Sequence, residues 1–188
     1  GGRQKAAKAF SNDFAGVARV DLTGVPGLVA GVSGYYGGSG QELKADLPTF
    51  IYEAHLDYKW RGLEVRGLFA RAHLQNVAQV NDELKLTEGK SLGETMQGWY
   101  AQVGFDVLSL VRETDMALTP FVRWEDINTQ VAVPSGFSAD PSTASQLLTA
   151  GLSFLPISSI VLKADYQRRI FKTGGASNQF NVLLGYIF

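Results

Sequence analysis

Residues 180–188 read Phe-Asn-Val-Leu-Leu-Gly-Tyr-Ile-Phe, and this stretch decides the fold class. Because side chains alternate across a β-strand, one face of this stretch is wholly apolar, and it carries Phe180, Val182, Leu184, Tyr186 and Phe188. A soluble protein rarely exposes such a strand, since an uncovered apolar strand promotes aggregation. A transmembrane β-barrel can carry it, because its last strand pairs with another strand and its apolar face meets lipid.

The same alternation recurs along the chain, and it is clearest in residues 49–60. One face of that segment holds the aromatic residues Phe50, Tyr52, Tyr58 and Trp60, while charged residues lie on the other face. Aromatic residues at both ends of a strand match the aromatic girdles of a membrane barrel. A strand of a soluble sandwich would also alternate, but its apolar face seldom carries so many aromatic residues at both ends.

Period-two alternation predicts about nine strands. They fall in residues 14–22, 28–34, 49–60, 63–66, 99–107, 118–124, 148–154, 162–170 and 180–188. The connections alternate between short turns and longer loops rich in Gly, Pro and Ser, as in outer-membrane barrels with short periplasmic turns. We therefore predict an all-β, transmembrane, antiparallel up-and-down β-barrel, with residues 1–188 forming one segment of it.

Composition excludes several classes of protein. The formal net charge is -1, which argues against a nucleic-acid partner, because such proteins need a basic surface. No apolar run is long enough for a transmembrane helix. There are no cysteines.

The first residues resemble a loop without a signal peptide or an initiating Met, and an odd strand count is unusual for a bacterial barrel. We therefore expect further strands upstream of residue 1.

The faces opposite the apolar ones carry charges of both signs in near balance, and we predict that these residues line a pore. The set is Arg19, Asp21, Glu53, His55, Asp57, Lys59, Glu64, Arg66, Asp106, Arg123, Glu125, Lys163, Asp165 and Arg169. Such charges can set the ion preference of a water-filled lumen. They can also form cross-strand ion pairs that only solvate the interior, and the two roles are compatible.

Three residues break the pattern, because Arg71, His73 and Arg168 share the apolar parity of their strands. A lipid-facing Arg near the bilayer midplane would cost about 2–4 kcal/mol. Each of the three comes about ten positions after a short turn, where a tilted strand leaves the hydrocarbon. We therefore expect them at the boundary of the membrane.

Catalytic and metal sites have little support in the sequence. His55 lies between Glu53 and Asp57, so it could bind a metal or act as a base, but a lone His in a polar lumen is more often an ordinary hydrogen-bonded residue. No G-x-S-x-G motif or nucleotide-binding motif is present. We predict no enzyme, no catalytic residue, no metal and no cofactor.

Several stretches resemble one protein family. They are FAGVARVDLTGVPGLVAGVSGYYGGSG at residues 14–40, LTPFVRWEDINTQ at 118–130, VPSGF at 133–137, VLKADYQ at 161–167 and the final GYIF. Together they resemble the C-terminal half of bacterial porins related to the phosphate-selective porins O and P. The resemblance implies a barrel of roughly 16 to 18 strands, commonly trimeric, that passes solutes without chemistry. The family's basic ladder and constricting loop would lie mainly upstream, so phosphate selectivity is not carried over to any residue here.

The predicted function is passive diffusion of small polar or ionic solutes across a bacterial outer membrane. The expected partners are outer-membrane lipid, the solutes, other copies of the chain in a trimer, and the barrel-insertion machinery, which would read the alternate residues of 180–188. Two alternatives remain open, namely a non-conducting barrel that anchors or sheaths a partner protein and a barrel hydrolase.

Overall fold

The structure, a computed structural model, describes residues 14–40, 43–86, 90–111 and 114–186. These residues form one antiparallel sheet of nine strands, each paired with the strands before and after it in the chain. The strands are β1 (Ala15–Leu22), β2 (Leu28–Gly38), β3 (Pro48–Trp60), β4 (Leu63–Leu74), β5 (Thr95–Phe105), β6 (Ala117–Ala132), β7 (Ala144–Ile157), β8 (Ile160–Phe171) and β9 (Ala176–Tyr186). The predicted all-β, up-and-down order of strands is confirmed.

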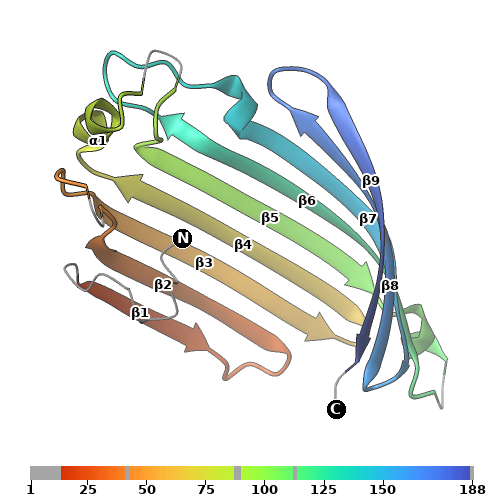
Figure 1. Cartoon of the computed structure of the whole chain (residues 1–188). Coiled ribbons are helices and arrows are strands. Elements are labelled where there is room, and N and C mark those ends of the chain that lie inside the picture. Colours follow the sequence, from red (N-terminus) through yellow and green to blue (C-terminus); the bar gives the residue numbers. More distant parts are fainter. Residues whose placement is uncertain (1–13, 41–42, 87–89, 112–113, 187–188) are drawn as a thin grey trace.

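The sheet curls into a trough, and it does not close (Figure 1). In the described chain, β1 pairs only with β2 and β9 pairs only with β8, so both strands have one free edge. Period-two sequences favour this pairing because every strand can turn one type of side chain to each face. Among the described residues, no helix is long and apolar enough to span a bilayer.

The connections alternate in length along most of the chain. Residues 61–62 and 158–159 form tight turns, whereas residues 39–47, 75–94 and 133–143 form long connections at the opposite end of the sheet. Two connections depart from the predicted rhythm. The β5–β6 connection is longer than predicted and contains the short 3-10 helix η2 (Val107–Leu110), and the β8–β9 connection comprises only residues 172–175.

Two strands continue beyond their clearest alternation. The alternation of the second strand ends at residue 34 and that of the fourth at residue 66, but these strands end at Gly38 and Leu74, close to the connections predicted to begin at residues 37 and 75. Small residues and the charged Arg71 hide the alternation there, but the backbone ladder continues because neighbouring strands supply its hydrogen bonds. The predicted strand positions Phe188 and Ile187 lie outside the described residues.

Two long connections form a small folded cap that the sequence did not predict. It contains helix α1 (Val77–Glu83), and its core consists of Leu47, Val77 and Val80. The buried Asn81 side chain donates to Ser91 Oγ at 2.7 Å and accepts from the Leu92 N–H at 3.1 Å. The described parts of these two connections are therefore held together by a local core.

The two faces of the sheet differ in chemistry and in exposure. The apolar face carries Tyr58, Val103 and Tyr166, and the polar face carries Glu125 and Asp165, with their neighbours of the same parity. The side chains of Glu125 and Asp165 are 16% and 10% exposed. On the apolar face, Val182 and Leu184 are 72% and 71% exposed. Since side chains converge on the concave side of a curved sheet, the polar face is the concave side.

We expect the cap to loosen in acid. The Glu83 carboxylate accepts the backbone N–H groups of Lys44 and Ala45 at 3.0 and 3.1 Å, and these hydrogen bonds lower the pKa of Glu83. A lowered pKa means that the stabilisation is present above the ordinary carboxyl range and is lost as the pH falls through the folded value. Hydrogen exchange of the Lys44 and Ala45 amides, corrected for intrinsic rates, should accelerate between pH 6 and pH 3. Glu83→Gln should remove most of this pH dependence, and an unchanged pH profile in that variant would contradict the assignment.

Candidate functional site on the polar face

The polar face carries the charged residues that the sequence predicted to line a pore, with one exception. Register places Arg19, Asp21, Glu53, His55, Asp57, Lys59, Glu64, Arg66, Arg123, Glu125, Lys163, Asp165 and Arg169 on this face. His55 apart, basic and acidic residues are equal in number in this set. Nearly all of them lie within reach of a partner of opposite charge.

Asp106 is the exception, because it lies just after β5 and not on a strand, although it still lines the cavity on this face. Its carboxylate Oδ1 accepts the N–H groups of Leu108 and Leu118 at 3.1 and 2.9 Å. A carboxylate in this position caps the first turn of a helix, because it satisfies backbone donors that have no partner within that turn. Asp106 therefore shapes the β5–β6 connection.

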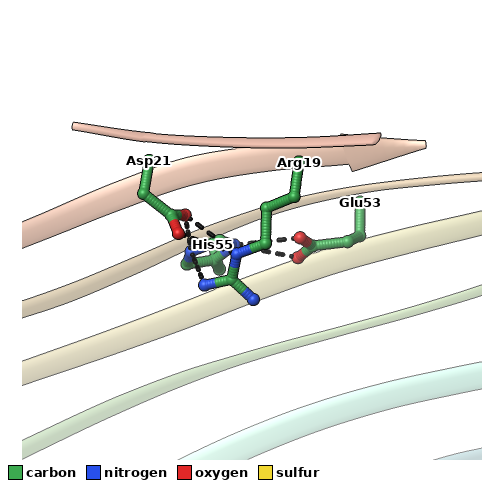
Figure 2. A network of polar contacts seen from close by, with 4 residues as sticks. All are labelled: Arg19, Asp21, Glu53 and His55. Carbon is green, nitrogen blue, oxygen red and sulfur yellow. Dashed lines mark hydrogen bonds and ion pairs between the residues drawn. The ribbon is translucent and has the colours of Figure 1, made fainter. Parts of the chain in front are cut away.

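A four-residue network joins the edge strand β1 to β3 (Figure 2). Arg19 Nε donates to Asp21 Oδ2 at 2.8 Å, and the His55 ring lies between two carboxylates. Its Nδ1 is 2.9 Å from Glu53 Oε1, and its Nε2 is 3.0 Å from Asp21 Oδ1. Arg19 Nη2 also lies 3.0 Å from His55 Nε2. With a proton on Nδ1, a neutral ring accepts from Arg19, whereas a charged ring donates to both carboxylates.

Gly31 makes this network possible. Its Cα is opposite both Asp21 and His55 in the register, so it lies under the contact between their side chains. A Cβ added at Gly31 would overlap Asp21 Oδ1 and would lie 2.6 Å from the His55 ring. Only glycine leaves room for a side-chain contact that spans the strand between its two partners.

Further along the trough, ion pairs form between neighbouring residues of β3, β4 and β6. Arg66 Nε is 3.0 Å from Asp57 Oδ2, and Lys59 Nζ is 3.7 Å from Glu64 Oε1. Arg123 Nη2 donates to Glu125 Oε1 at 2.7 Å. Pairs of this exposure contribute about 0–1 kcal/mol each, so their main effect is to cancel charge.

Aromatic rings support two cations on the polar face. The Arg123 guanidinium lies 3.8 Å from the centre of the Tyr100 ring, and Lys163 Nζ lies 4.6 Å from that of Phe121. Asp165 accepts from Gln167 at 3.0 Å and from Asn181 at 2.9 Å. Sequence reasoning missed Tyr100, Phe121 and these amides. Their alternate positions along each strand place them on the charged face, and this pattern could have identified them.

A cavity of about 520 Å³ opens on this face near the β3–β4 turn. Its lining includes Lys59, Glu64, Arg66, Phe121 and Lys163. Its mixed lining of charged, hydroxyl and aromatic groups suits water and polar solutes. A second, shallower hollow of about 230 Å³ lies towards the cap, and it is lined mainly by apolar residues that include Ile51, Met96 and Ile127.

The arrangement holds no recognisable reactive centre. His73, the other histidine, lies on the apolar face, where its Nδ1 is 3.1 Å from Thr95 Oγ1. No serine hydroxyl in the described chain forms a hydrogen bond with either histidine. Within the same residues, no group of three His, Asp or Glu side chains is arranged to hold a metal ion.

Comparison with known proteins adds one distant relative. No model of a known protein family matches the chain. An uncharacterized protein of Aquifex aeolicus (strain VF5) is 28% identical over 192 residues, which cover 99% of this chain and 44% of that protein. The chain therefore spans less than half the length of this relative.

Filling the space at Gly31 should break the network of Figure 2. We expect Gly31→Val to separate Asp21 from His55 and to destabilise the β1–β2 ladder by about 1–3 kcal/mol, since the added side chain overpacks the site. Hydrogen exchange of the β1 and β2 amides measures the loss. Gly16→Val is the matched control, because nothing lies within 4 Å of an added Cβ there. Equal exchange in the two variants would refute the role of Gly31.

Proposed function

We propose that this chain is part of a porin-like β-barrel of a bacterial outer membrane, through which small polar or ionic solutes diffuse passively. The observation that carries the proposal is the apolar face. It is continuous over all nine strands, its residues are exposed on eight of them and half-buried on β4, and no described segment covers it. A soluble sheet buries its apolar face under a second layer. A membrane barrel leaves that face to the lipid.

The upper limit of the apolar face gives independent support. Polar residues begin at Gln97 on β5, at Asp126 on β6, at Gln146 on β7, and at Arg168 and Asn178 on β8 and β9. From each strand to the next, the residue at which the apolar face ends shifts by about one position relative to its register partner. With a rise of about 3.3 Å per residue and a strand spacing of about 4.8 Å, a level boundary requires strands tilted by about 35°. Transmembrane barrels have tilts of roughly 35–45°.

The free edges of β1 and β9 support closure by further strands. A long, unpaired edge beside an apolar face promotes aggregation, and closure into a barrel removes such edges. The match covers only 44% of the Aquifex aeolicus relative, so a protein of that length has residues for more strands. The resemblance to porins O and P, a barrel of 16 to 18 strands and a trimer stay predictions, as does recognition of residues 180–188 by the insertion machinery.

The polar face supports diffusion without strong ion preference. Its basic and acidic residues are equal in number and largely paired, so the contribution of this wall to the lumen potential is small. Water, hydroxyl groups and paired charges provide a surface along which polar solutes can move. No covalent step is part of this mechanism, and no cofactor enters it.

A second function is favoured by one observation. The hollow lined by Ile51, Met96 and Ile127 is an apolar patch on the polar face. A scaffold that sheaths a partner protein would use such a patch to hold an apolar segment in the lumen. A stoichiometric partner that copurifies with the full-length protein and blocks its conductance would favour this function over diffusion.

Glu125 and Asp126 offer a matched test of the pore, because the two neighbours point to opposite faces. Full-length protein in planar bilayers should conduct, and Glu125→Gln should shift the reversal potential in a KCl gradient towards anion preference. Loss of a lumenal negative charge is the reason. Asp126→Asn should leave the reversal potential unchanged. Protein that inserts without conductance would refute the channel, and equal shifts would refute the assignment of the faces.

The depth of the apolar face can be tested by introducing arginine on β6. Val122 lies within the apolar face between Val103 and Ala150, whereas Asn128 lies just beyond its upper limit at Asp126. In vesicles, Val122→Arg should lower the free energy of unfolding by about 2–4 kcal/mol and Asn128→Arg by about 0–1 kcal/mol. Denaturant titrations followed by tryptophan fluorescence measure both values. Similar values for the two variants are expected if water, not lipid, covers this face.

A further inference from the structure

The arginines of the sheet divide into two groups according to their partners. On the polar face, Arg19, Arg66 and Arg123 each contact a carboxylate, and Arg169 Nη1 donates to Ser145 Oγ at 2.9 Å. On the apolar face, Arg71 and Arg168 form no ion pair or hydrogen bond with any described residue. Arginines on the polar face therefore have partners within the protein, whereas those on the apolar face have none among the described residues.

The surroundings of Arg71 provide donors but no anion. Its neighbours in the register are Tyr52 and Gln97, and His73 and Phe69 share its face on β4. Arg71 Nε is screened from solvent and has no hydrogen-bond partner, as is also true of Arg66 Nε and Arg123 Nε, but those two arginines contact carboxylates and Arg71 does not. A screened guanidinium N–H without an acceptor is unfavourable, since burial of an unsatisfied donor carries its full desolvation penalty.

Arg168 is exposed on β8, opposite Leu148 of β7 and Asn178 of β9. Asp126 is the one carboxylate on the apolar face of the described strands, and its Oδ2 accepts from Gln146 at 3.1 Å. From the strand spacing and the rise per residue, Asp126 lies roughly 12 Å from each arginine along the sheet, too far for an ion pair. Neither arginine has an anion within the described chain.

Both arginines lie at the upper limit of the apolar face. Arg71 is in the same register row as Gln97, and Arg168 is in the row of Asn178, four residues further along the strands and four strands away. This displacement follows the tilt of about 35°, so the two guanidinium groups lie at one height when the strands are tilted. At that height a bilayer presents the phosphate groups of its lipids.

We propose that Arg71 and Arg168 bind the phosphate groups of membrane lipids and so form two lipid-binding positions on the outer surface of the barrel. The inference rests on the proposed function, because it requires the apolar face to meet lipid. Guanidinium binds phosphate through charge-assisted and often bidentate hydrogen bonds. Gln97 and Asn178 lie directly opposite the two arginines and add amide groups for the remaining headgroup oxygens.

The test compares two lipids that share their acyl chains. Full-length protein in detergent is loaded with dioleoyl phosphatidic acid or with dioleoylglycerol digalactoside, which has no phosphate, and retained lipid is counted by native mass spectrometry. Wild-type protein should retain the phosphatidic acid preferentially. Arg71→Gln and Arg168→Gln should each weaken its binding about tenfold, since a charge-assisted hydrogen bond is lost.

Arg169→Gln is the matched control, because Arg169 adjoins Arg168 and points to the polar face. It should leave lipid retention unchanged. Equal retention of the two lipids by wild-type protein, or equal affinities in all three variants, would overturn the inference. Conductance of each variant in planar bilayers reports folding and also separates the two proposals. Conducting variants with unchanged lipid affinity refute lipid binding alone, whereas wild-type protein that never enters a bilayer refutes the proposed function.

Discussion

The uncovered apolar face is the constraint on which the rest of the structure depends. Nine strands satisfy one another's backbone groups through the ladder, but a single sheet has no second layer to bury its large apolar side chains. The environment must therefore supply that layer. In the proposed function lipid does so, and it does not compete for backbone hydrogen bonds.

The opposite face meets a different requirement, because charges in a narrow trough repel or attract over short distances. Its acids and bases alternate along and across the strands, so most charges are neutralised locally. This charge pairing also restricts the residue types of the strands. The position of Gly31 must lack a side chain, because Asp21 reaches His55 across β2 at that point. Arg71 and Arg168 on the apolar face have no such partner among the described residues, and we propose lipid phosphate in that role.

Much of the architecture could be predicted from the alternation of polar and apolar residues along the chain. Alternation has a period of two and is a local property, so it located all nine strands and the face of nearly every charged residue. The prediction failed in the connections, where polar and apolar residues do not alternate. The cap around Val77 and Val80 depends on packing between two connections, and Asp106 depends on backbone donors of a helical turn. Neither leaves a periodic signal in the sequence.

The sequence by itself therefore determined the strands, their order of pairing and the separation of an apolar from a charged face, because these depend on neighbouring residues in the chain. Only the tertiary structure decided which charges pair, where the cap forms and at which height on each strand the apolar face ends relative to its neighbours. These features depend on the register between strands. A shift of two residues in register would keep every face and change every cross-strand partner.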